Sequence, residues 1–344
     1  MGDRENLFYK LLIFRSRGIG AVKYHELIRD SGSAEAAVES LHVSGELMDS
    51  VKREIELAES IGVKYLTDDS DLFPEIYKSV RNHAPIISVR GNINTLKKKT
   101  VGIVGTRHAS AAGIKFTSTL AHEFSSNGFA VVSGMAMGTD TAAHSGALLN
   151  SGDSETIAVL AGGVDYIWPS ENEKLYREIL MRGAVISDMP VGFVPVASNF
   201  IARNRIVAGI SERLILGEAD EKSGSVTTAN FALEYGRQLW AIPGHPSDER
   251  SVGPNRFIAN GLAKLCGGSN DFFANNVSDD HKKHQTSNKE ILSNELLDLI
   301  GSIPVSEDVL TNIVKKNISQ ISSELVVLEL NGLIKKTAFG YVRV

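Results

Sequence analysis

The sequence predicts an α/β protein built around a doubly wound, mostly parallel β-sheet. Two observations lead to this fold class. From about residue 100, short runs rich in β-branched residues alternate with stretches of helical periodicity. These runs are also continuously apolar, which is typical of strands that helices cover on both faces.

The central segment, residues 71–273, is expected to hold this sheet as one domain. After the first strand, Ile114, Leu120 and Phe124 recur near helical spacing, and Gly128 provides a C-terminal stop. The other strands are followed by similar stretches. The expected strands are 100–105, 129–134, 156–162, 184–188, 213–219 and 238–244.

Residues 1–70 are expected to form a small helical domain with Gly-bearing turns. Within it, residues 17–27 (RGIGAVKYHEL) have the Gly-x-Gly turn and following helix of a helix-hairpin-helix unit, which could offer backbone N–H groups to a nucleic-acid phosphate. The alternative is a plain helical turn packed on the main domain. Residues 1–70 carry 9 basic and 13 acidic residues, and this net charge of −4 favours the plain turn.

Two further segments follow the central domain. Residues 274–289 (ANNVSDDHKKHQTSNK) contain almost no apolar side chain and are expected to form a flexible linker. Residues 290–344 show three helices and a closing β-hairpin, the order found in a winged helix. The third helix carries Glu324 and Glu329 and no basic residue. Because such a helix repels phosphate, we interpret this domain as a protein-interaction or packing module.

Composition and charge limit the class of protein. The chain has 344 residues, a net charge of −5 and a single cysteine, Cys266. One cysteine cannot form an internal disulfide, and no run approaches the roughly 18 apolar residues of a membrane span. We therefore expect a soluble cytoplasmic protein that does not contact a membrane. The net charge excludes a broad basic surface, but the central domain balances 19 basic against 19 acidic residues and can still concentrate arginines locally.

The loops after the strands are the expected location of a binding site. In an open parallel sheet, ligands bind at the carboxyl ends of the strands, near helix N-termini that favour anions. The loop after the fifth expected strand is the most informative, because it carries Ser223-Gly224-Ser225 and Thr227-Thr228 at the start of a clear helix. Small and hydroxyl-bearing residues at such a position form a phosphate cradle, although an ordinary N-cap uses the same residue types.

Three arginines strengthen the phosphate interpretation. Arg107, Arg203 and Arg205 all fall at the same expected edge of the sheet. A guanidinium group suits bidentate contacts to phosphate. The sequence therefore predicts a local basic pocket on a neutral domain.

Several motifs of catalysis and cofactor binding do not occur in the chain. It contains no G-x-x-x-x-G-K-[ST], G-x-G-x-x-G or G-x-S-x-G sequence. His281 and His284 offer only two ligands, so we expect no metal site there. Asp140 and His144 are assigned to capping and packing. With no nucleophile beside a base and no paired carboxylates, we expect no catalytic residues and no cofactor.

Motifs along residues 70–270 resemble the DNA-processing protein A family, DprA or Smf. Residues 73–92 resemble that family's lead-in to the sheet, and 324–334 (ELVVLELNGLI) are similar to its winged-helix domain. The helical N-terminus suits its SAM-like or helix-hairpin-helix domain. The matching motifs are GIVGTRHAS (102–110), VVSGMAMGTDTAAHSGAL (131–148), TIAVLAGGVDYIWPSEN (156–172), AVISDMPVG (184–192), FIARNRIVAGIS (200–211), EADEKSGSVTTANFALEYGR (218–237), AIPGHP (241–246) and SVGPNRFIANGLAKL (251–265).

The resemblance implies an extended Rossmann-like domain and a recombination mediator that is not an enzyme. Such a protein binds single-stranded DNA in a basic pocket, forms a homodimer, protects incoming single strands and loads the RecA recombinase during natural transformation. Carried over position by position, the implied DNA-binding residues are Gly105, Thr106, Arg107, Ser133, Gly134, Arg203, Asn204, Arg205, Lys222, Ser223, Gly224, Ser225, Thr227 and Thr228.

The chain departs from the family pattern at three positions. Met137 stands where the family usually has a basic residue, so one phosphate contact is lost or supplied elsewhere. Asp188 replaces a usual Glu, and Ile201 replaces a usual Pro before the Arg-Asn-Arg motif.

Two other function classes are weaker alternatives. Nucleotide hydrolases of the LOG or lysine-decarboxylase-like type share this Rossmann variant but carry a P-G-G-x-G-T-x-x-E signature. The corresponding segment here is SGSVTTANFALE, in which no acid falls at the position of the signature Glu, and Glu234 lies two turns into the helix. A winged-helix regulator that binds duplex DNA is disfavoured by the acidic third helix.

Overall fold

The computed structural model describes residues 3–150, 156–274, 295–301, 304–314, 318–330, 332–337 and 340–343. The chain divides into two compact units, residues 1–279 and 280–344. The division falls within the segment 274–289 that was expected to be a linker. Apart from Ala274, which ends helix α12 (Ser269–Ala274), that segment lies outside the described residues.

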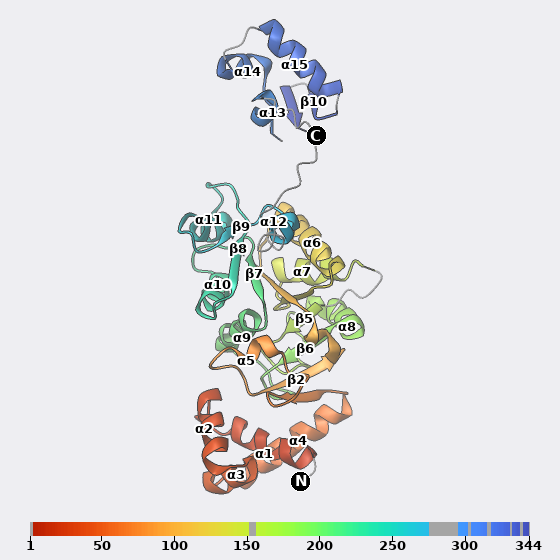
Figure 1. The fold of residues 1–344 in the computed structure, drawn as a ribbon. Coiled ribbons are helices and arrows are strands. Elements are labelled where there is room, and N and C mark those ends of the chain that lie inside the picture. Colours follow the sequence, from red (N-terminus) through yellow and green to blue (C-terminus); the bar gives the residue numbers. More distant parts are fainter. Residues whose placement is uncertain are drawn as a thin grey trace, which may run out of the picture. The chain divides into compact units, whose positions relative to one another are not determined.

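A large sheet forms the centre of the first unit and confirms the expected α/β fold (Figure 1). Its strand order is β1-β2-β6-β5-β4-β3-β7-β8-β9, and the strands from β6 to β9 in this order are parallel. The chain runs outward from β3 in both directions, as in a doubly wound sheet. The strands are β1 (Lys64–Thr67), β2 (Ile86–Gly91), β3 (Thr100–Val104), β4 (Ala130–Ser133), β5 (Thr156–Val159), β6 (Ala184–Ser187), β7 (Arg213–Leu216), β8 (Gln238–Ala241) and β9 (Lys264–Leu265).

One edge of the sheet is antiparallel, which the strand pattern alone did not predict. Strand β2 runs antiparallel to both β1 and β6. Ser88 stands opposite Ser187, and its hydroxyl donates a hydrogen bond of 3.0 Å to the Ser187 carbonyl. Strand β1 falls inside residues 1–70, which were expected to be helical. Those helices end at Ser60, and the chain then enters the sheet.

Helices cover both faces of the sheet because successive strand residues point to opposite sides. Val101 and Ile103 pack with Leu120 and Phe124 under one helical layer, whereas Val104 belongs to the core under the other. Figure 1 shows α6, α7 and α8 on one side of the sheet and α9 and α10 on the other. The helices are α5 (Glu75–Lys78), α6 (Ala111–Ser126), α7 (Thr139–Ala147), α8 (Glu173–Arg182), α9 (Ala197–Gly209), α10 (Gly224–Glu234) and α11 (Val252–Ala259), with 3-10 turns η1 (Ile93–Lys97), η2 (Ser170–Asn172) and η3 (Glu249–Ser251).

Four N-terminal helices form their own small core beside the antiparallel edge. They are α1 (Asp3–Arg15), α2 (Ala21–Ser31), α3 (Ala34–Leu41) and α4 (Gly45–Ser60). Ile86 of β2 belongs to the same core as Leu12 and Tyr24, so the helices and the sheet share buried surface. Arg15 reinforces this junction, because its guanidinium pairs with Glu54 at 2.8 Å and donates to the Asp188 carbonyl at 2.9 Å.

The second unit has the helices and hairpin expected of a winged helix. They are α13 (Glu295–Leu299), α14 (Glu307–Val314), α15 (Ile318–Leu330), β10 (Ile334–Thr337) and β11 (Gly340–Arg343). Its core joins Leu310, Leu325 and Tyr341. In both units, no described helix is both long and apolar enough to cross a membrane.

Candidate functional site

A pocket of about 650 Å³ opens at the carboxyl ends of the central parallel strands. Its walls begin at Val104, the last residue of β3, and at Gly105, and they continue through Gly134 after β4. Trp168, Ala197 and Ser223 extend it past the ends of β5, β6 and β7. Because β3 has β4 on one side and β7 on the other, the pocket lies where the direction of winding reverses. This is the position at which open α/β sheets bind ligands.

An exposed arginine lies over two aromatic rings of the pocket. The Arg107 guanidinium carbon is 4.9 Å from the centroid of the Trp168 ring and 5.8 Å from that of Phe200. The two rings meet edge to face, with centroids 4.5 Å apart. Arg107 forms no ion pair with a carboxylate in the described part of the chain. The pocket therefore offers an uncompensated positive charge beside apolar ring surface.

The N-terminus of α10 forms another part of the pocket wall. Ser223 caps the helix, since its hydroxyl oxygen accepts a hydrogen bond of 3.4 Å from the Val226 N–H and lies 2.7 Å from the Ser225 hydroxyl. Gly224 and Ser225 occupy the first turn, where N–H groups have no acceptor within the helix. Asn204 donates from Nδ2 to the Gly224 carbonyl at 3.1 Å and holds this turn against α9. The arrangement is suited to an anion.

Arg203 and Asp140 form the buried floor of the pocket. The Arg203 guanidinium donates to the carbonyls of Gly134 and Val159. Asp140 accepts from the N–H groups of Gly134 at 3.1 Å and Ala136 at 3.3 Å. Burial lowers the pKa of Arg203 to about 10, with Asp140 opposing and Arg107 adding to this shift, so Arg203 keeps its charge at neutral pH. Burial also raises the pKa of the Asp140 carboxyl, and Arg203 opposes that rise.

Glycines at the pocket floor have a steric role. A Cβ at Gly134 would lie 2.5 Å from the Arg203 guanidinium, and one at Gly105 would lie 2.4 Å from the Thr139 hydroxyl. Gly224 differs, because a Cβ there would meet only the Asn204 amide at 3.7 Å. Protein packing therefore requires the first two glycines, whereas Gly224 faces open pocket space.

The structure brings ten of the fourteen residues implied by the resemblance to the pocket wall. They are Gly105, Thr106, Arg107, Gly134, Arg203, Asn204, Ser223, Gly224, Ser225 and Thr228.

The other four lie apart from the pocket wall. Ser133 is fully buried and donates to the Ile103 carbonyl at 2.6 Å. Arg205 turns away: it pairs with Asp188 at 2.7 Å and donates to the Asn82 carbonyl at 2.8 Å. Lys222 and Thr227 are also absent from the pocket wall. Of the three arginines expected to share one pocket, Arg107 and Arg203 line it, whereas Arg205 is engaged in an ion pair with Asp188.

Sequence reasoning missed the aromatic part of the site. Tyr166, Trp168 and Phe200 all line the pocket, although none was among the expected site residues. They fall in segments that follow β5 and β6, so the rule that ligands bind at strand ends could have found them. Ile201, which stands where the family usually has Pro, lines the pocket with 55% of its surface exposed.

His144 and Asp140 have the packing roles expected for them. His144 is fully buried, and its Nδ1 lies 2.7 Å from the Thr156 hydroxyl. That hydroxyl donates to the Val131 carbonyl and so accepts from Nδ1–H. Burial, followed by the charge of Arg203, lowers the pKa of His144 to about 3, which keeps the imidazole neutral.

Two solved structures and a curated protein resemble this chain. Protein Smf of Synechocystis is 36% identical over 202 residues, which span 58% of this chain and 50% of that protein. The structure of DNA processing protein A from Streptococcus pneumoniae matches with a TM-score of 0.67 and 27% identity, over 80% of this chain and 99% of that one. DNA processing protein A from Helicobacter pylori, whose structure concerns its single-stranded DNA binding mode, matches with a TM-score of 0.56 and 30% identity, over 63% and 98%.

Family models cover each part of the fold. A DprA-like N-terminal HHH domain matches residues 4–55, and a DprA winged helix domain matches residues 281–338. The model described as DNA recombination-mediator protein A matches residues 64–276, which include the whole pocket. The chain therefore belongs to the DNA recombination-mediator protein A family.

Proposed function

We propose that this chain binds single-stranded DNA in the pocket at the carboxyl ends of β3–β7 and acts as a recombination mediator. In this role it protects incoming single strands and loads the RecA recombinase during natural transformation. It acts by binding, without catalysis and without a cofactor. The observation that carries the proposal is the position of Arg107 over Trp168 and Phe200, in the same pocket as the N-terminus of α10.

This combination suits an unpaired strand. Single-stranded nucleic acid is bound by positive charge that follows the backbone together with aromatic rings on which bases stack. In the pocket, Arg107 and the first turn of α10 supply phosphate contacts, and Trp168 and Phe200 supply ring surface. Duplex DNA hides its base faces within the stack and cannot use those rings.

Within the site we separate contacting residues from supporting ones. Arg107, Ser223, Gly224 and Ser225 are assigned to direct phosphate contact: Arg107 through its exposed guanidinium, and the other three because they form the start of α10 at the pocket wall. Arg203 is assigned to support, since its guanidinium is engaged by backbone carbonyls and only 6% of its surface is exposed. Arg205, Lys222, Ser133 and Thr227 are not assigned to contact.

The proposed partners beyond DNA are RecA and a second copy of this chain. Family membership supports both. In the second unit, Val326 and Val327 of α15 are each about half exposed, and Glu329 of the same helix is exposed. An apolar and acidic helix face is better suited to a protein than to phosphate, which supports a role for this unit in protein contact.

A mobility-shift comparison of a single strand with its duplex tests the DNA assignment. The single strand should bind more tightly, and its affinity should fall with salt with a slope of about −0.7 for each phosphate neutralised. Preference for the duplex would refute the assignment. RecA filament formation on the same strand, followed with and without this chain, tests loading separately. Release of free base from a nucleoside monophosphate would instead support the nucleotide-hydrolase alternative.

A further inference from the structure

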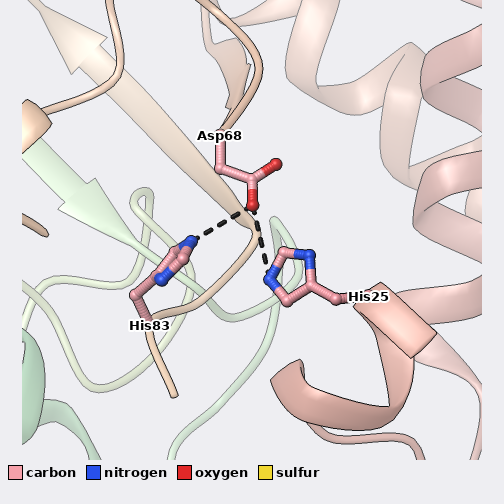
Figure 2. A group of neighbouring side chains, drawn as sticks. All are labelled: His25, Asp68 and His83. Carbon is pink, nitrogen blue, oxygen red and sulfur yellow. Dashed lines mark hydrogen bonds and ion pairs between the residues drawn. The ribbon is translucent and has the colours of Figure 1, made fainter. Parts of the chain in front are cut away.

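Three side chains of metal-ligand type converge at the junction of the N-terminal helices and the sheet, as Figure 2 shows. His25 belongs to α2, Asp68 directly follows β1, and His83 precedes β2. The Nε2 atoms of His83 and His25 lie 3.1 Å and 3.4 Å from the same carboxylate oxygen, Oδ2 of Asp68. All three ligand atoms lie within 4.8 Å of one another.

His83 contacts the backbone through one ring nitrogen and presents the other to the Asp68 carboxylate. Nδ1 of His83 lies 2.8 Å from the Val80 carbonyl, which can only accept, so Nδ1 carries the proton. Nε2, which faces the Asp68 oxygen at 3.1 Å, is therefore the atom that would bind a metal ion.

His25 also presents a ring nitrogen to Asp68. Its Nε2 is buried and makes no hydrogen bond within the described residues, although it stands 3.4 Å from the Asp68 oxygen. The ammonium group of Lys10 pairs with the neighbouring Asp69, at 2.6 Å, and not with Asp68.

The spacing of these atoms matches a tetrahedral metal site. Ligands about 2.0–2.1 Å from a zinc ion in tetrahedral geometry lie about 3.3 Å from one another. Two of the three separations here, 3.1 Å and 3.4 Å, already have that value. We propose that His25, Asp68 and His83 form a binding site for a divalent transition-metal ion, with Zn²⁺ the favoured ion.

The donor set and its surroundings support this choice of ion. Two imidazole nitrogens and one carboxylate oxygen suit zinc, whereas Ca²⁺ and Mg²⁺ require sites made mainly of oxygen. The Nδ1–H of His83 bonded to a backbone carbonyl is the usual outer contact of a metal-bound histidine. The rings of Phe73 and Tyr77, with centroids 5.8 Å and 5.7 Å from that of His83, hold its orientation. Three protein ligands leave a fourth position for water.

Such an ion would join elements that are distant in sequence. It would attach α2 to the end of β1 and to the segment before β2. Binding to the folded form only would stabilise the junction between the helices and the sheet. This role is independent of the DNA pocket, so its failure would leave the proposed function untouched.

Zinc competition against a chromophoric chelator tests the site on the full chain, free of affinity-tag histidines. The main variant is Asp68→Asn, which keeps the size of the side chain and removes the charged ligand, and His83→Gln is the second. His42→Asn is the matched control. His42 is an exposed histidine that follows α3 among the N-terminal helices, and its backbone has a left-handed conformation that Asn tolerates. A double variant, His281→Ala with His284→Ala, removes the histidines of the segment 274–289.

We expect one tightly bound zinc ion in the wild type, in His42→Asn and in the double variant. Asp68→Asn should weaken binding at least about 100-fold, since a lost ligand costs more than a lost outer contact. Zinc should also raise the midpoint of thermal unfolding in the double variant and leave that of Asp68→Asn unchanged. Equal affinity in Asp68→Asn and the wild type, or loss of binding in the double variant, would overturn the site.

Discussion

The Arg107 guanidinium lies over the indole of Trp168, 4.9 Å from the ring centroid. A cation held in this way is oriented without being neutralised, because the ring attracts it through its quadrupole and forms no ion pair. The charge therefore remains available to a phosphate.

Arg107→Ala should weaken single-strand binding by about 30-fold, corresponding to the loss of one charge-assisted contact of about 2 kcal/mol. The slope of affinity against salt should become shallower by about 0.7. Arg177→Ala is the control, because Arg177 is an exposed arginine of α8 that pairs with Glu173 at 2.6 Å. Binding titrations at several salt concentrations measure both values, and equal slopes in the two variants would contradict the role of Arg107.

Arg107→Lys separates charge from planarity at the same position. Lysine keeps the positive charge but cannot stack as a planar group. The salt slope should therefore match the wild type while the affinity falls. A lysine variant that binds as tightly as the wild type would show that stacking on Trp168 is dispensable.

Gly224→Ala and Gly134→Ala should have opposite consequences. The first places a methyl group in pocket space, where it meets only Asn204 at 3.7 Å, so stability should be retained and DNA affinity reduced. The second forces a Cβ to 2.5 Å from Arg203 and should cost about 1–3 kcal/mol of unfolding free energy. Urea unfolding and DNA titration of both variants measure the contrast. A destabilised Gly224→Ala with normal affinity would refute it.

Arg205→Ala tests the one arginine that the structure removes from the expected pocket. Its partner Asp188 has 7% of its side chain exposed, so the variant leaves a buried carboxylate uncompensated and should lose about 3 kcal/mol of stability. Below the unfolding transition, the folded variant should bind a single strand as the wild type does. Asp188→Glu, which restores the residue usual in the family, should keep the ion pair. A specific loss of DNA affinity in folded Arg205→Ala would return this residue to the site.

His144 makes stability depend on pH in a defined direction. Its pKa is about 3 in the folded protein and about 6.5 when unfolded, so its contribution is fully present above pH 6.5 and is lost as pH falls toward 3. Between pH 7 and pH 5 this loss amounts to about 2 kcal/mol. In His144→Gln, the difference in unfolding free energy between these two pH values should shrink by about that amount. An unchanged difference would mean that another group causes the acid sensitivity.

The central strands could be predicted from the sequence because each is short, apolar and followed by a helical pattern. β1 and β2 could not be assigned in the same way. Lys64–Thr67 (KYLT) is only four residues long and begins with a lysine, which makes its strand signal weak. Ile86–Gly91 (IISVRG) is buried over its first four residues, but Ser88 and Arg90 interrupt its apolar run. It pairs antiparallel with both neighbours, and composition carries no information about pairing direction.

The site was predictable to the extent that backbone topology determines it. Gly105, Arg107 and Ser223 meet because parallel strands end at one edge. Side-chain direction was not predictable: Arg203 and Arg205 are two residues apart on α9, and one enters the pocket while the other pairs with Asp188. Trp168 comes from the loop after β5 and Phe200 from the first turn of α9, and only the fold places them under Arg107.

The antiparallel edge also limits how the chain can be divided into fragments. A fragment that starts at residue 71 would discard β1 and expose the hydrogen-bonding groups of β2, creating an open edge of the kind that promotes aggregation. Ile86, which belongs to the core of the N-terminal helices, would become a surface residue as well. The N-terminal helices therefore act as a cap on the sheet, and in a shortened form of this protein loss of solubility would precede any loss of binding.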